Sequence, residues 1–91
     1  METRVAVMSI IVEEPNSVEQ LNAYLHEYGE FIIGRMGIPY RAKARKINII
    51  SIAIDAPQDI ISTLAGKIGK LPGIGVKTAY SSVINYAESE L

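Results

Sequence analysis

The side chains best suited to chemistry in this 91-residue chain are basic, and they gather in its middle. Residues 31 to 50 contain five arginine and lysine residues and no acid, whereas residues 1 to 30 contain six acids and one base, Arg4. Guanidinium groups bind carboxylates and phosphates through two parallel hydrogen bonds. The middle segment therefore predicts a site for a small anionic ligand. The contact residues that we predict are Arg35, Gly37, Tyr40 and Arg41.

The basic segment is also compatible with two roles that involve no ligand. The first is a solvated turn, in which the charges face water only. The second is an ion-pair contact with the acidic first thirty residues of a neighbouring subunit. The further basic residues that would take part in any of the three roles are Lys43, Arg45 and Lys46.

Few residues support catalysis or metal binding. The chain has no cysteine, which excludes zinc ribbons, thiolate-held iron–sulfur clusters and cysteine nucleophiles. His26 is the only histidine, and a pair with Glu30 falls short of the three or four ligands of a tight metal site. Glu13 and Glu14 are paired acids, but acids near a helix N-terminus are favoured by its dipole alone. We expect no catalytic residue, no metal and no cofactor.

Two predicted strands, Val5 to Val12 and Ile47 to Ile54, are apolar on both faces. Successive residues of a strand point to opposite faces, so a sheet built on these strands needs cover on both sides. A chain of this length has enough helix for one cover and buries only roughly 60 to 65% of its unfolded surface. We therefore expect a second copy of the chain as the other cover.

Two segments have the periodicity of helices. Ser17 and Gln20 have the spacing of a capping box at the start of the first helix, which ends at Gly29. The second helix begins after Pro57 and ends at the turn after Leu71. The apolar residues that recur every three or four positions in the first helix are Val18, Leu21, Leu25 and Tyr28.

Phe31 to Met36 and Ile74 to Tyr80 complete the set of strands. The order strand, helix, strand, strand, helix, strand predicts an α+β fold, a ferredoxin-like βαββαβ sandwich. Its four-stranded antiparallel sheet would have both helices on one face and the first and third strands at its centre. We expect one domain over residues 1 to 80 and a tail over residues 81 to 91.

Several partners and locations are not indicated. Ile47 to Ile54 has no aromatic residue on which RNA bases stack, and the net charge is −1, so we expect no direct sequence-specific nucleic acid binding. No segment is long enough to span a bilayer, and no export-type cleavage site follows the first apolar run. We expect a cytoplasmic protein that does not contact membranes.

Two stretches resemble a known family: GRMGIPYR at residues 34 to 41, preceded by Tyr28-Gly29, and LAGKIGKLPG at residues 64 to 73, followed by Val76-Lys77-Thr78. They are similar to the iron-only hydrogenase system regulators, and the similarity extends to about Tyr80. That family is similar in fold to ACT domains, to the C-terminal domain of the nickel-responsive regulator and to the acetolactate synthase small subunit. The resemblance implies a regulatory domain that senses a ligand or binds a partner.

The chain departs from these relatives at their sites. The nickel-responsive regulator binds metal through several histidines and a cysteine and reads DNA through an N-terminal ribbon-helix-helix, neither of which this chain shows. Nickel sensing and DNA reading therefore do not transfer. ACT domains hold an amino acid beside a glycine in the first strand-to-helix loop, where this chain has residues 13 to 16, EEPN. A site of that type is not supported.

We therefore predict a non-catalytic regulatory domain that forms a homo-oligomer, either dimer or tetramer. Its ligand would lie at a subunit interface and bind one arrangement of subunits better than another. Two alternatives stay open. One is a pure assembly module without a small-molecule ligand, and the other is a small dimeric ferredoxin-like enzyme, which would require a buried ionisable group inside the sandwich.

Overall fold

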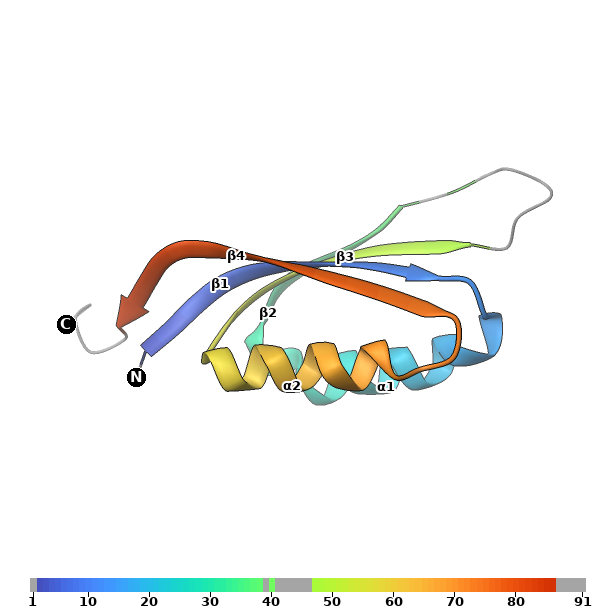
Figure 1. Cartoon of the computed structure of the whole chain (residues 1–91), viewed down its shortest axis with the longest axis horizontal. Helices are drawn as coiled ribbons and strands as arrows, with labels where there is room; N and C mark the ends of the chain where they lie inside the picture. Colours follow the sequence, from blue (N-terminus) through green and yellow to red (C-terminus); the bar gives the residue numbers. More distant parts are fainter. Residues whose placement is uncertain (1, 39, 41–46, 87–91) are drawn as a thin grey trace.

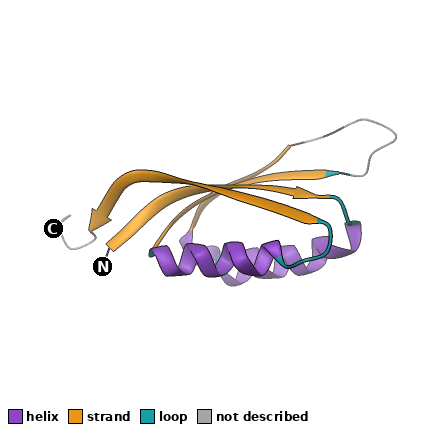
Figure 2. Cartoon of the chain, in the orientation of Figure 1, coloured by secondary structure: helices purple, strands orange, loops and turns teal. Residues whose placement is uncertain are grey.

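The computed structural model describes residues 2–38, 40 and 47–86, and it has two layers, a sheet and a pair of helices (Figures 1 and 2). Both helices lie on the same side of the sheet. In chain order the elements are β1 (Glu2–Val12), the 3-10 turn η1 (Pro15–Ser17), α1 (Val18–Glu27), the 3-10 turn η2 (Gly29–Phe31), β2 (Ile32–Ile38), β3 (Asn48–Ala56), α2 (Gln58–Gly69) and β4 (Ile74–Tyr86). No helix in the described ranges has the length and apolar character needed to cross a bilayer.

The four strands form one antiparallel sheet in the order β2-β3-β1-β4. β1 and β3 are central, and β2 and β4 form the edges. The predicted ferredoxin-like α+β sandwich is therefore confirmed, including its two central strands. The strands that the sequence makes apolar on both faces are the ones with a neighbour on each side.

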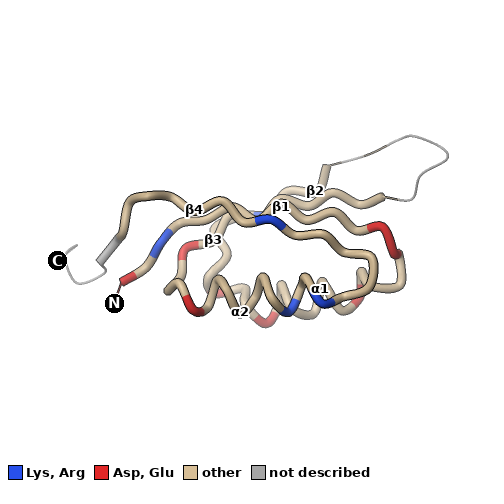
Figure 3. Tube along the Cα trace, in the orientation of Figure 1, with Lys and Arg blue, Asp and Glu red and all other residues tan. Residues whose placement is uncertain are grey.

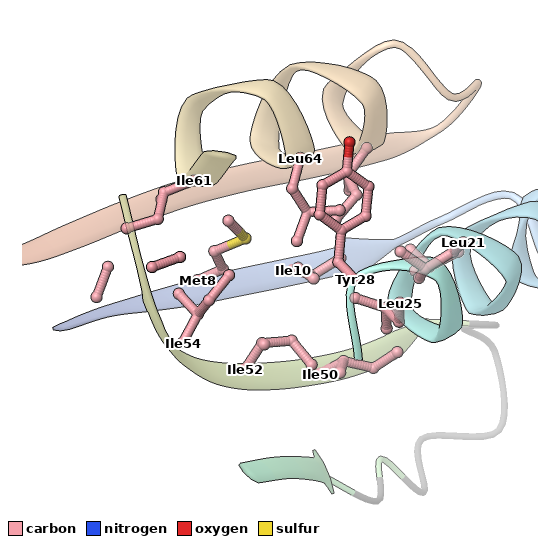
Figure 4. Packing of buried hydrophobic residues seen from close by; sticks show 14 residues of the cluster. Met8, Ile10, Leu21, Leu25, Tyr28, Ile50, Ile52, Ile54, Ile61 and Leu64 are labelled. Carbon is pink, nitrogen blue, oxygen red and sulfur yellow. The ribbon is translucent and has the colours of Figure 1, made fainter. Parts of the chain in front are cut away.

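The hydrophobic core fills the space between the sheet and the helices (Figure 4). Alternate residues of the central strands point into it, and cross-strand partners such as Met8 and Ile52 are both fully buried. The helices contribute aliphatic side chains from one face each. The largest fully buried side chains are Met8, Ile10, Leu21, Ile52, Ile54, Ile61, Leu64, Ile68 and Val12.

The predicted capping box at Ser17 is wrong. The Ser17 side chain makes no cap bond to the helix, and its hydroxyl instead donates to the carbonyl oxygen of Pro72 at 2.7 Å. Ser17 is buried, so a carbonyl from a connection 55 residues away outcompetes the local backbone for its hydroxyl. The bond joins the start of α1 to the turn between α2 and β4.

Gly73 brings the same two connections together. Its backbone φ is +69°, a conformation that residues with a side chain rarely adopt. A Cβ atom added there would lie 2.5 Å from the Cβ of Glu14. The Gly73 carbonyl accepts a hydrogen bond from the Glu13 amide at 2.7 Å. Glycine is therefore required at this turn by both its dihedral angle and its close contact.

β4 continues beyond the predicted end at Tyr80 to Tyr86, so part of the expected tail belongs to the sheet. The pairing with β1 is irregular on the way, because Ala6 pairs with Tyr80 but Arg4 pairs with Ile84. One residue of β1 thus stands opposite three of β4, and the strand bends sharply in this region (Figure 1). This bulge breaks the alternation that marks a strand in the sequence. The remaining tail residues, 87–91, lie outside the described residues.

Candidate functional site

A groove lies between α1 and the edge strand β2, and we call it the α1–β2 groove. It is a cavity of about 450 Å³, and a second cavity of about 410 Å³ adjoins it and shares Asn22 and Arg35. Cavities of this size suit small molecules. The first cavity is lined by Val18, Asn22, Arg35, Gly37, Ile38, Asn48, Ile49 and Ile50. The second adds Leu25, His26, Gly29 and Ile32.

Arg35 is positioned by the register of the edge strand. It pairs with Ile52, whose side chain is in the core, so Arg35 points to the helix side of the sheet. Because β2 is an edge strand, the side chain meets α1 rather than the core. Its Nη2 donates to Oδ1 of Asn22 at 2.8 Å, which orients the guanidinium along the groove.

Gly37 follows Arg35 by two residues and therefore shares its face. A Cβ atom built on Gly37 meets no heavy atom within 4 Å. The missing side chain thus leaves open space in the groove. The packing around Gly37 does not require a glycine at this position. A larger residue would project into this space without disturbing the core.

The groove has a positive electrostatic character. None of the residues that line either cavity in the described part of the chain is an acid, and no described carboxylate pairs with Arg35. The other polar groups are the amides of Asn22 and Asn48 and the imidazole of His26. Within the described ranges, no cluster of three or more histidine or acidic residues offers a metal site. The arrangement suits an anion.

The structure brings together two of the four predicted contact residues, Arg35 and Gly37. Tyr40 is 43% exposed and does not line the groove. Arg41 lies outside the described residues, as do Lys43, Arg45 and Lys46.

The sequence analysis missed Asn22 and Asn48. Asn22 lies one helical turn after Val18, at the border of the apolar stripe of α1. A polar residue at such a border indicates a side chain that faces the edge of the sheet rather than its core. The paired acids do not form a site: the Glu14 carboxylate accepts from the amide of Asn16 at 3.1 Å, which is a structural role, and Glu13 is exposed.

A second candidate surface is the sheet face opposite the helices, which no described element covers (Figures 1 and 2). We call it the open sheet face. Its large exposed side chains are Val7 at 41%, Ile11 at 46%, Met36 at 60% and Ile38 at 43%. The register adds small residues between them, and Lys77 lies opposite Ser9. Charges are sparse in this layer compared with the helices (Figure 3). A polar row of Ser51, Ser9 and Lys77 crosses this face between the apolar residues. Soluble monomers rarely expose large contiguous apolar patches.

The two surfaces meet at the end of β2. Ile38 pairs with Ile49, which pairs with Ile11 on the open sheet face, and Ile38 and Ile49 also line the α1–β2 groove. A molecule in the groove and a protein on the sheet face would therefore be neighbours.

Sheet order, helix placement and an uncovered sheet face define an ACT-like domain of the ferredoxin-like class. The chain belongs to the TM1266-like family, described as iron-only hydrogenase system regulators, whose family model matches residues 4–78. The resemblance seen in the sequence is thus confirmed. A search of curated proteins finds no match.

Three solved structures illustrate the relationship. The uncharacterized protein TM1266 from Thermotoga maritima is 32% identical with a TM-score of 0.79, covering 86% of this chain and 96% of that one. The ACT domain of GTP pyrophosphokinase from Chlorobium tepidum is 20% identical with a TM-score of 0.62, covering 89% of each chain. The C-terminal domain of MgtC from Mycobacterium tuberculosis is 10% identical with a TM-score of 0.66, covering 86% and 87%. The last two share the fold alone.

Proposed function

We propose that this chain is a non-catalytic regulatory domain that binds a small anionic ligand in the α1–β2 groove. The observation that carries the proposal is Arg35, held by Asn22 in a ligand-sized groove whose described lining contains no acid. The family description as a regulator of an iron-only hydrogenase system supports a regulatory role. The four contact residues proposed from the sequence, Arg35, Gly37, Tyr40 and Arg41, stay part of this proposal.

The partner in this proposal is a second copy of the chain, seated on the open sheet face of the first in a dimer or a tetramer. Ligand binding and assembly would be coupled because Ile38 and Ile49 belong to both surfaces. Such coupling is typically about 1–3 kcal/mol. Ligand binding would then change the strength of self-association, and a regulated partner would respond to that change.

The proposal predicts that an anionic ligand raises the melting temperature, because it binds the native state alone. We would follow melting and light-scattering mass with a panel of organic acids, nucleotides and phosphate. Arg35→Gln should abolish the stabilisation by the active compound. Lys70→Gln is the matched control, since it removes one positive charge from an exposed residue just after α2. Equal stabilisation of all three proteins would contradict the site.

A pure assembly module without a ligand is the second candidate. The open sheet face alone supports it, because self-association through that face requires no ligand. It predicts an oligomer whose mass and melting temperature do not respond to any compound. The third alternative, a small enzyme, is not favoured, because the described side chains buried between the sheet and the helices include no acid, histidine, lysine or arginine. Asp55 has a buried carboxylate oxygen without a hydrogen-bond partner, but it pairs with Val5 on the opposite face of the sheet, outside the sandwich.

A further inference from the structure

We infer that the α1–β2 groove selects small organic acids with an apolar body and discriminates against the amino acids of the same skeleton. This inference rests on the proposed function, since it names the ligand class of that site. Three features of the groove support it: a cationic end, an apolar wall and a described lining that contains no acid.

The cationic end is Arg35. A guanidinium has five N–H donors, and its bond to Asn22 uses one, which leaves donors available for a carboxylate. The same bond fixes the direction of the planar group before a ligand arrives. A carboxylate that docks there forms charge-assisted hydrogen bonds, which are about twice as strong as neutral ones.

The wall of the groove is aliphatic. Val18 and Leu25 from α1, Ile32 from β2 and Ile50 from β3 lie on the helix side of the sheet, so three elements provide apolar surface along the two adjoining cavities. The side chains of Ile38 and Ile49 point to the open sheet face and are not part of this wall. Gly37 adds no side chain and leaves the space between the wall residues open. A branched hydrocarbon chain of a few carbons would exchange water for this wall, which stabilises binding in proportion to the apolar area covered. Inorganic anions would gain nothing from it.

The described lining holds nothing that would balance an ammonium group. The only ionisable side chains that line the two described cavities are Arg35 and His26, and neither carries negative charge. An α-ammonium sits within a few bonds of its carboxylate, so it would lie close to the Arg35 guanidinium. It would lose hydration and face a like charge, both of which weaken binding.

The test compares four probes by calorimetric titration of the full chain. The probes are 4-methyl-2-oxopentanoate, L-leucine, 4-methyl-2-oxopentanamide and inorganic phosphate. The oxo acid should bind at least about tenfold more tightly than each of the others, since leucine carries an ammonium in place of the oxo group, the amide removes the charge and phosphate removes the apolar body.

Two variants of one strand separate the groove from the fold. Gly37→Val places a branched side chain in the groove and should abolish binding of the oxo acid. Gly34→Val is the matched control, because Gly34 pairs with Ala53 on the opposite face and its added Cβ also meets no atom within 4 Å. It should bind the oxo acid as the unaltered chain does. Arg35→Gln should weaken binding at least about tenfold.

Each outcome bears on one proposal. Leucine binding as tightly as the oxo acid, or no response to any carboxylate at millimolar concentration, would overturn the inferred ligand class. If phosphate binds more tightly than the oxo acid and its binding requires Arg35, the apolar wall has no role in ligand selection. The anion site of the proposed function would still be supported. Light scattering on the same samples reports on self-association separately.

Discussion

Ser17 shows how one side chain joins two connections that are distant in the sequence. Its hydroxyl bonds the Pro72 carbonyl instead of the local backbone, and the residue is buried. Ser17→Ala leaves that carbonyl without this donor, so we expect the free energy of unfolding to fall by about 1–2 kcal/mol. Urea unfolding monitored by circular dichroism measures the change.

Gln20→Ala is the control that distinguishes this bond from a capping box. In a capping box the two side chains act together, and Gln20 would also stabilise the helix start. In the structure Gln20 is exposed, so its replacement should change stability by less than about 0.5 kcal/mol. Equal losses of unfolding free energy in the Ser17→Ala and Gln20→Ala variants would support the capping box instead of the bond to Pro72.

Residue-scale contacts such as these could be predicted from the sequence only where the partner is local. Arg35 and Gly37 were found because a basic segment is visible in the chain. Asn22 and Asn48 were not, because the fold brings them to the groove from α1 and the start of β3. The spacing of Ser17 and Gln20 predicts a bond to the local backbone, because spacing reveals nothing about a carbonyl 55 residues away.

At the scale of elements, one lysine ties the two helices together. Lys67 on α2 lies 3.5 Å from Oε2 of Glu27 on α1, and its ammonium is 5.1 Å from the ring centre of Tyr28 and 5.6 Å from that of Tyr24. The hydrogen bond with Tyr28, and then the charge of Glu27, raise the pKa of Lys67 above its ordinary value. The charged form is therefore the one that the folded state favours.

This link predicts a pH dependence. Because the folded-state pKa is raised, the stabilisation is complete below the ordinary lysine pKa of roughly 10.4 and is lost as pH rises through the higher folded-state value. The melting temperature of Lys67→Met should lie below that of the unaltered chain by a constant amount between neutral pH and about pH 9. The difference should shrink above that range. A Lys70→Met control, which lacks this pair of rings, should show no such trend.

The elements themselves followed from periodicity, with one informative exception. Alternation and three-to-four-residue spacing place β1, β3 and both helices, because buried faces impose those periods. β4 exceeds its predicted length since the bulge opposite Val5 shifts the alternation after Tyr80. Periodicity therefore predicts regular strands well and cannot follow a strand through a bulge.

At the scale of the whole molecule, a second copy on the open sheet face would account for the apolar residues that the central strands place there, Val7, Ile11 and Ile49, beside Ser9 and Ser51. With strands about 4.8 Å apart and about 3.3 Å per residue, an eight-residue stretch of four strands covers roughly 500 Å². Two copies packed face to face would remove roughly 1,000 Å² from water, which reaches the lower bound for a specific interface. A domain of this size gains stability from such burial, because its own core is small.

Ile11→Glu tests this interface directly. Ile11 is 46% exposed on the central strand β1 and ends the apolar row formed with Ile49 and Ile38, so a carboxylate there would be buried without a partner between two copies. We expect the light-scattering mass to fall from a multiple of 10.0 kDa to 10.0 kDa, with far-ultraviolet circular dichroism unchanged. Ser62→Glu, which adds the same charge to an exposed position of α2, should keep the mass of the unaltered chain. An unaltered chain that weighs 10.0 kDa at every concentration, or an Ile11→Glu variant that keeps its oligomeric mass, would remove the sheet face as the contact and with it the coupling to the groove.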